Sequence, residues 1–424
     1  MNAVATLRLK PNRHFPFLNR HPWVRAHSIA EHVVGPTGED ATPGKPAMSV
    51  ALGDVVDVTD SRGVFVGRGL VNPHGKLRVR LYSFDASVAV DGGLFCRAID
   101  AAVARRRLVN PASPQSGERL VFSESDLISG LIVDRYANHL SVSMTSLALS
   151  RYADAIIDHL KQTIAPEGMV RRFDEKTYRL EGGEAAGVPI ETLRGTIGSI
   201  PTDGVPYQSG GLTYRVDLTG GQKTGGYLDQ RDNHAAAARY MAGRRVLDVC
   251  CYHGGFALAA AAAGAASVTG LDASRSALEV ADAAAAENGL EVDFIQGDCF
   301  DVLSDMAGGG QSYDAVILDP PRLAGSAASV EAAMRAYHRL NASAVALLPA
   351  GGILVTCSCS GRVSETDFLK MLSDVGRRTG RDLVVMEFRG AAADHPVAVA
   401  CPESRYLKCA IVSVGPARPS GNFG

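Results

Sequence analysis

Residues 244–272 read "RRVLDVCCYHGGFALAAAAAGAASVTGLD", and this stretch decides the fold class of the second half of the chain. The run "RRVLDVCC" has the length and composition of a buried strand, "FALAAAAA" reads as a helix, and "SVTGLD" reads as the next strand. Strands that alternate with helices form parallel sheets with helices on both faces. The stretch therefore predicts a doubly wound α/β domain.

The same alternation continues downstream. Ser274 or Ser276 can cap a helix that ends at Gly289. The strand-like runs "EVDFIQGD", "YDAVILDPP" and "GGILVTCS" follow, and a long helical run precedes the last of them. We expect a Rossmann-like domain over residues 201–424.

The first half of the chain has a different pattern. Up to residue 84 the runs "DVVDVTD", "GVFVGRGLVN" and "KLRVRLYSF" read as short strands between turns, which favours a small all-β domain. Residues 85–200 mix helical and strand segments and predict an α+β domain. A chain of 424 residues is long enough for three domains. We therefore expect domains at 1–84, 85–200 and 201–424.

The composition is that of an ordinary globular protein. Charged residues make up 21% of the chain, hydrophobic residues 46%, and the net charge is −2. The eight cysteines have irregular spacings that fit no metal motif and no disulfide framework, so we expect no metal and a reducing, cytoplasmic setting. No apolar run approaches the roughly 20 residues of a membrane span.

Positive charge is concentrated locally. No acid precedes Glu31, and further basic clusters lie at 76–80 and 105–107. Local patches of this kind attract phosphates, which predicts an RNA-binding surface. The alternative is a solvated surface without a partner. The basic residues of the first stretch are Arg8, Lys10, Arg13, Arg20 and Arg25.

The predicted α/β domain carries acids where a ligand would bind. The turn "LDVCCYHGGFAL" lacks the GxGxxG pattern that cradles a pyrophosphate, which disfavours a dinucleotide. Carboxylates at the carboxyl ends of strands suit a cationic ligand with ribose hydroxyls, such as S-adenosylmethionine (SAM). The alternative is that aspartate makes good turns and caps there. The acids are Asp248, Asp272, Asp298 and Asp319.

The stretch "ILVTCSCSG" at 353–361 raises the question of a nucleophile. Cys357 and Cys359 are two residues apart, and a strand sends such residues to the same face, so the pattern predicts similar surroundings for both. Unpaired cysteines are usually buried and inert. The spacing alone leaves open which sulfur is reactive.

Several motifs together resemble one family. They are "RHPWV", "ESDLISGLIVDRY", "KTGGYLDQRDN", "DVCCYHGGFAL", "LDPPR", "SCSG", "DHPV" and "YLKC". Over nearly its whole length the chain resembles the SAM-dependent large-subunit ribosomal RNA cytosine-C5 methyltransferases of the RlmI type. The resemblance implies an N-terminal PUA-like RNA-binding domain, a central α+β domain and a C-terminal Rossmann-like class I methyltransferase domain, with SAM as cofactor and ribosomal RNA as partner.

The resemblance also implies the site residues. The family's nucleophilic cysteine precedes Ser-Gly, which corresponds to Cys359, and Cys357 is then a packing residue. Asp319 of "LDPPR" is expected to stabilise the cytosine adduct. The family motifs and the acids at the strand ends together give the expected cofactor-binding residues, which are Tyr227, Asp229, Arg231, Asp248, Tyr252, Gly254, Phe256, Asp272, Asp298 and Asp319.

Two other functions stay open at this point. A nitrogen-directed RNA methyltransferase could use the same Asp-Pro-Pro loop and would not need Cys359. A non-catalytic RNA-binding assembly factor could retain the fold without the reaction. The sequence does not determine the oligomeric state, and a homodimer is the assembly that we keep open.

Overall fold

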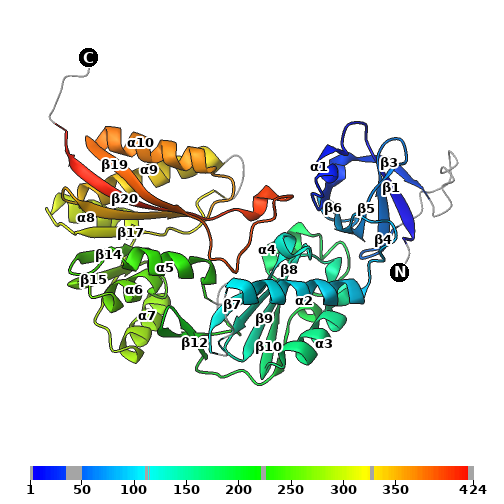
Figure 1. The fold of residues 1–424 in the computed structure, drawn as a ribbon, viewed down its shortest axis with the longest axis horizontal. Helices are drawn as coiled ribbons and strands as arrows, with labels where there is room; N and C mark the ends of the chain where they lie inside the picture. Colours follow the sequence, from blue (N-terminus) through cyan, green and yellow to red (C-terminus); the bar gives the residue numbers. More distant parts are fainter. Residues whose placement is uncertain are drawn as a thin grey trace, which may run out of the picture. The chain divides into compact units, whose positions relative to one another are not determined.

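The computed structural model describes residues 3–34, 50–109, 113, 115–220, 226–324 and 329–418. The described chain forms sheets of six, five and seven strands and a two-stranded pair, β12 (Val205–Ser209) with β13 (Leu212–Val216) (Figure 1). Two compact units contain these sheets, and the boundaries expected at residues 84 and 200 stay a prediction. The first unit is Met1–Tyr207, Val216–Gly226 and Asp394–Ser404, and the second is Gln208–Arg215, Tyr227–Ala393 and Arg405–Gly424.

The six-stranded sheet of the first unit has the order β2-β6-β5-β4-β1-β3. Its buried face is lined by aliphatic side chains at alternating strand positions, such as Val56 and Val58. The small all-β region predicted from the sequence is therefore present, with β1 paired in parallel to β4. The strands are β1 (Ala5–Leu9), β2 (Trp23–Arg25), β3 (Ile29–Val34), β4 (Val55–Thr59), β5 (Phe65–Val71) and β6 (Leu77–Ser83).

The five-stranded sheet of the same unit has the order β11-β10-β9-β8-β7. Helices α2 and α3 bury side chains such as Phe95 and Ile156 in one core with Val133 and Leu140 of the sheet, as expected for an α+β region (Figure 1). The elements are α2 (Gly92–Val109), β7 (Gly117–Phe122), β8 (Leu131–Tyr136), β9 (His139–Met144), α3 (Ala153–Ile164), β10 (Gly168–Arg172), α4 (Glu175–Leu180) and β11 (Gly195–Gly198).

The basic clusters differ in what they contact. Arg106 is 1% exposed, and its guanidinium donates two hydrogen bonds of 2.6 Å to Asp126, so it stabilises the unit from inside. Arg80 is also buried and pairs with Glu181 at 3.0 Å. The prediction that these two arginines meet phosphate is therefore wrong, because buried guanidinium groups need acidic partners within the protein. Exposed basic residues of the first cluster are Lys10, Arg13, Arg20 and Arg25.

The seven-stranded sheet of the second unit has the order β16-β15-β14-β17-β18-β20-β19. The first five strands pair in parallel, and β20 lies antiparallel between β18 and β19. This is the Rossmann-like sheet that the sequence predicts. The strands are β14 (Arg245–Val249), β15 (Ser267–Asp272), β16 (Asp293–Gln296), β17 (Ala315–Leu318), β18 (Gly352–Ser358), β19 (Arg381–Arg389) and β20 (Lys408–Ala417).

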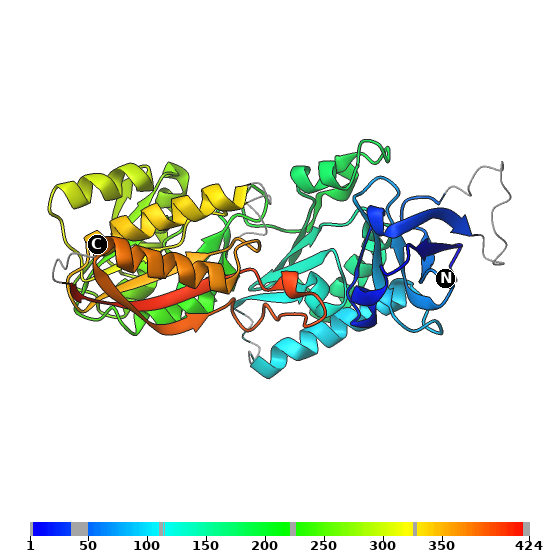
Figure 2. The ribbon, with the colours of Figure 1, turned by 90° about the horizontal axis from the view of Figure 1, so that it is seen from above.

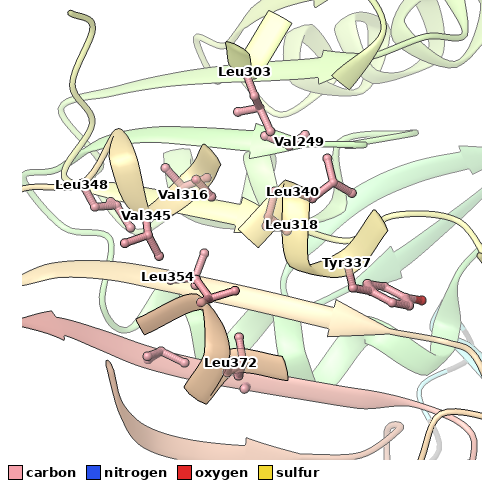
Figure 3. Packing of buried hydrophobic residues seen from close by; sticks show 14 of the residues in the cluster. Val249, Leu303, Val316, Leu318, Tyr337, Leu340, Val345, Leu348, Leu354 and Leu372 are labelled. Carbon is pink, nitrogen blue, oxygen red and sulfur yellow. The ribbon is translucent and has the colours of Figure 1, made fainter. Parts of the chain in front are cut away.

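Helices cover both faces of this sheet. Figure 2 shows α9 and α10 side by side over one face, and the side chains of Leu340 and Leu372 from these helices lie in the same core as Val316 and Leu318 (Figure 3). Ile317 points the other way, into a core with residues of α5 and α6. The helices are α5 (Arg231–Ala238), α6 (Gly255–Ala262), α7 (Arg275–Glu287), α8 (Cys299–Gly308), α9 (Val330–Ala346) and α10 (Glu365–Thr379).

Helix ends follow the sequence signals. The Ser274 side chain accepts a hydrogen bond from the Ala277 N–H at 3.3 Å and caps α7, which ends two residues before Gly289. This confirms the predicted helix start. Within the described residues, no helix has both the length and the apolar character that crossing a membrane requires.

Candidate active site

The order of the C-terminal sheet reverses between β14 and β17, and ligands of open α/β sheets bind beyond the carboxyl ends of such strands. Asp248 lies in β14, and Asp272 lies at the end of β15. The charge of Asp272 raises the pKa of Asp248, so the two side chains are close together. Asp319 follows β17 and also raises the pKa of Asp248. Three of the four predicted acids therefore gather at this edge.

The turn after β14 has an unusual backbone. Cys250 and Tyr252 have φ angles of 61° and 50°, in the left-handed region where side chains are disfavoured. Gly254 has φ 75° and begins α6. Left-handed non-glycine residues cost about 1–2 kcal/mol each, so neighbouring contacts must hold this turn.

Asp272 supplies one of those contacts. One carboxylate oxygen accepts the Tyr252 N–H at 2.9 Å, and the other accepts the Ser274 N–H at 2.8 Å. Each oxygen keeps a second lone pair, and the side chain is only partly buried. Asp272 therefore fixes the turn and can still accept hydrogen bonds from a ligand.

Asp248 lies beneath the turn. Its side chain is fully buried, and one oxygen accepts the Ala257 N–H of α6 at 2.9 Å. Burial, followed by the nearby charge of Asp319, raises its pKa well above the ordinary range. A protonated carboxyl that anchors α6 fits this environment. Asp248 therefore supports the turn from within the core and is not exposed to a ligand.

Asp319 is positioned by a chain of amides. Its Oδ2 accepts a hydrogen bond of 2.9 Å from Gln230, whose own oxygen accepts one of 2.6 Å from Asn233. Both amide side chains are buried, and Asn233 also donates to the Gly390 carbonyl. Sequence reasoning missed Gln230 and Asn233 as site residues, although both lie in the quoted motif "KTGGYLDQRDN"; positions 223–225 of that motif are outside the described residues.

Tyr227 lies among the predicted site residues. Its ring packs edge-on against Tyr252 with 4.9 Å between centroids. Burial raises its pKa to about 12, and the charges of Asp319, Asp229, Cys359 and Asp272 raise it in that order. One phenol thus lies near four of the predicted residues, from four separate segments of the chain.

The remaining predicted residues have different surroundings. The Asp229 carboxylate accepts a hydrogen bond of 2.5 Å from the Tyr406 hydroxyl. Arg231 pairs with Asp232 at 3.2 Å, and Asp298 is exposed and caps α8 through the Phe300 N–H. Phe256 is buried in α6 behind the turn, where His234 packs against its ring.

The two cysteines of "ILVTCSCSG" do not share surroundings. Strand β18 ends at Ser358, so Cys359 has left the strand and is partly exposed. Cys357 is fully buried and pairs across the sheet with Cys409, and burial raises its pKa well above the ordinary range. The predicted similarity is wrong, because strand alternation holds only as far as the strand continues.

Serines on either side hold the Cys359 loop. Ser358 and Ser360 are both fully buried, and their hydroxyls lie 3.0 Å and 3.1 Å from the Tyr337 hydroxyl. The Ser360 oxygen also accepts the Ala324 N–H at 3.2 Å. This network fixes the backbone on both sides of Cys359, and that residue stays partly exposed, as a nucleophile requires.

Comparisons with known proteins show the family to which this chain belongs. A sequence model of S-adenosylmethionine-dependent methyltransferases matches residues 197–392, and a PUA-like domain model matches residues 7–84. A protein of Tolumonas auensis named ribosomal RNA large subunit methyltransferase I is 36% identical over 96% of this chain and 99% of its own. The protein of that name from Shewanella denitrificans is 34% identical with the same coverage. The chain belongs to the ribosomal RNA large subunit methyltransferase I family.

Solved structures share the fold of this family member. A protein from Streptococcus mutans described as a SAM-dependent methyltransferase has a TM-score of 0.78 at 18% identity, and covers 96% of this chain and 99% of its own. A methyltransferase solved with S-adenosylhomocysteine has a TM-score of 0.79, also at 18% identity. Membership of the family makes SAM the cofactor, as expected from the sequence.

One group of described side chains could hold a metal: His21, Cys401 and Glu403 in the first unit. His21 Nδ1 accepts the Trp23 N–H at 3.2 Å, so Nε2 carries the ring hydrogen and faces Glu403 at 3.3 Å. The Cys401 thiol donates to the same carboxylate oxygen at 3.5 Å. Hydrogen bonds account for this cluster, and it carries no metal assignment.

Proposed function

We propose that this methyltransferase transfers the methyl group of SAM to C5 of a cytosine in large-subunit ribosomal RNA through a covalent adduct with Cys359. The observation that carries the proposal is the partly exposed residue Cys359, held between two buried serines and lying near Asp319 and Tyr227. Methylation at a ring carbon needs such a nucleophile, whereas methylation at nitrogen does not.

The proposed substrate rests on the relatives and on the first unit. The relatives described above are named as ribosomal RNA methyltransferases, and residues 7–84 match a PUA-like domain. Four exposed basic side chains in residues 10–25 can contact RNA phosphates. A paired cytosine could not reach a pocket at the sheet edge, so the target is a single-stranded or flipped nucleotide. We retain residues 1–84, 85–200 and 201–424 as the proposed domains, and the cytoplasm as the proposed location.

The side chains at the sheet edge suit SAM. The carboxylates of Asp229, Asp272 and Asp319 all act on the Tyr227 phenol, so negative charge is concentrated where a cationic cofactor would lie. SAM supplies an electrophilic methyl group when it is bound. We assign Asp272 to the ribose hydroxyls and Tyr252 to the wall of the site, whereas Asp248 and Phe256 support the turn from behind.

The proposed chemistry begins with the thiolate of Cys359. The sulfur adds to C6 of cytosine, which makes C5 nucleophilic, and Asp319 shares a proton with N3 to stabilise the adduct. After C5 has gained the methyl group, loss of the C5 proton to a base and loss of the sulfur from C6 restore the ring. The hydrogen bond from Gln230 keeps the Asp319 carboxylate oriented for its role.

Asp272→Ala is expected to weaken SAM binding by about 1–3 kcal/mol, the cost of leaving buried polar groups unmatched. Loss of the Tyr252 N–H contact adds to the effect, since the turn then loses one of its supports. Isothermal titration calorimetry with SAM measures the change. Asp293→Ala, at an exposed position on the neighbouring strand, is the matched control. Equal affinity in Asp272→Ala and the wild type would remove Asp272 from the site.

The proposed function is tested by identifying the product. Ribosomal RNA from a strain that lacks the gene is incubated with the purified protein and SAM, and its nucleosides are analysed by mass spectrometry. We expect the appearance of 5-methylcytidine. A methyl group on a base nitrogen would instead support the nitrogen-directed reaction. If neither free RNA nor assembling particles gain a methyl group, a non-catalytic assembly factor would be favoured.

A further inference from the structure

Lys408 is a buried lysine at the first position of β20, directly opposite Ser358 in the sheet. Only 2% of its surface is exposed. Its Nζ donates hydrogen bonds of 2.7 Å to the Ser360 carbonyl and 2.8 Å to the Tyr406 carbonyl. Lysine is almost never so completely buried, and the mechanism outlined above does not use this one.

The two hydrogen bonds fix the ammonium group without neutralising it. Both acceptors are uncharged carbonyls, and one belongs to the residue that follows Cys359. The amine therefore lies against the loop that presents the thiol. Burial lowers the Lys408 pKa to about 8, whereas the negative charges of Cys359 and then Glu365 raise it and Arg322 lowers it further. The interaction with Cys359 is the largest of these charge effects.

We propose that the Lys408 ammonium, fixed by the carbonyls of Ser360 and Tyr406, is a positioning residue that stabilises the thiolate form of Cys359. The inference rests on the proposed function, in which Cys359 is the nucleophile. On ionisation the Cys359 proton passes to solvent water, because the thiol is partly exposed and the ammonium already holds three hydrogens. A thiolate beside a lysine cation is more populated at neutral pH than an isolated thiol.

Three described groups that interact together with Cys359, namely Tyr227, Tyr337 and Asp319, do not supply this positive charge. Tyr227 and Tyr337 have raised pKa values through burial, so their phenols are neutral at pH 7. The Asp319 carboxylate acts on the same two phenols as Cys359 does, and its negative charge disfavours a second anion nearby. A fixed cation offsets this repulsion, and the position of Lys408 beside the Cys359 loop meets that need.

The pH dependence has a definite sign. Below about pH 8 the lysine is charged and supports the thiolate, and above that pH the support fades as the ammonium loses its proton. Glu365 acts on the lysine from α10 and raises its pKa, whereas Arg322 acts from the loop after β17 and lowers it. The effect of Lys408 on Cys359 is therefore largest at neutral pH.

The test measures alkylation of Cys359 by iodoacetamide from pH 5.5 to 9.5 in the full chain without RNA or SAM, with the modified peptide quantified by mass spectrometry. In the wild type we expect the alkylation rate to reach half of its maximum at a pH below the ordinary thiol pKa of about 8.5; this pH is the midpoint. Lys408→Met should shift the midpoint upward by about one unit or more and lower alkylation at pH 7 about tenfold. Lys408→Arg should restore part of the effect. Lys370→Met, an exposed lysine of α10, is the matched control and should not shift it.

A wild-type midpoint at or above 8.5 would overturn the inference even if Lys408→Met fails to fold. An unchanged midpoint in folded Lys408→Met would overturn it too. Failure of the proposed function looks different, because methylation would then survive in Cys359→Ala whatever the alkylation profile shows. A normal thiol midpoint together with an inactive Cys359→Ala would reject the role of Lys408 alone.

Discussion

Cys359→Ala is expected to abolish methyl transfer, because no other partly exposed thiol lies in the described loop between β18 and α10. RNA with 5-fluorocytosine at the target should trap the wild-type enzyme, since fluorine cannot leave as the C5 proton does. The trapped adduct should need SAM, and denaturing electrophoresis would detect it. Cys359→Ala should form no adduct.

Cys357→Ala is the matched control for this experiment. Cys357 is fully buried against Cys409, so its loss should cost about 1 kcal/mol of stability and leave both adduct and methylation in place. Methylation that survives in Cys359→Ala would reject the C5 mechanism in favour of nitrogen methylation. An adduct mapped to Cys357 would retain the mechanism and transfer the role of nucleophile to the other sulfur.

Asp319→Asn is expected to lower kcat by about 10²–10⁴-fold, the usual contribution of a proton-sharing side chain. Asparagine keeps an oxygen that can accept the Gln230 hydrogen bond, so the loop should keep its position while the carboxylate is lost. Single-turnover methylation at saturating SAM and RNA measures the change. The loss of kcat should exceed any loss of SAM affinity.

Asp314→Asn is the matched control, because Asp314 precedes the opposite end of the same strand, β17. Its carboxylate accepts the Arg245 N–H at 2.9 Å, and asparagine can do the same. This variant should keep kcat within about twofold, as substitutions away from a site usually do. A similar kcat in Asp319→Asn and Asp314→Asn would mean that the Asp-Pro-Pro loop only shapes the pocket.

The parallel part of the C-terminal sheet could be predicted because its strands are buried on both faces. Val316 and Ile317 of β17 point to cores on opposite faces of the sheet. The strand therefore appears in the sequence as an unbroken apolar run, and helical segments precede and follow it. The position of β20 could not be predicted in this way. Its place between β18 and β19 comes from pairing between residues far apart in the chain, which no local pattern records.

The positions of candidate site residues could be predicted where the residue type itself suggests a chemical role, and the roles stay predictions. Asp272 and Asp319 lie at strand ends as expected, and Cys359 lies beside them. Gln230 and Lys408 were not identified, because an amide or a lysine within a motif looks like any surface residue until its burial is known. Similarly, sequence alone could not tell that β18 stops at Ser358, which separates the two cysteines.

The insertion of β20 has a consequence for the order in which the protein is made. Strand β18 and the Cys359 loop are synthesised before β19, yet β18 gains its second neighbour only when residues 408–417 have emerged. Until then one edge of β18 is open, and the loop lacks the lysine that holds its backbone. A nascent chain therefore completes the loop of the proposed nucleophile only when β20 has been made, and synthesis that stops before β20 should yield a protein that does not modify RNA.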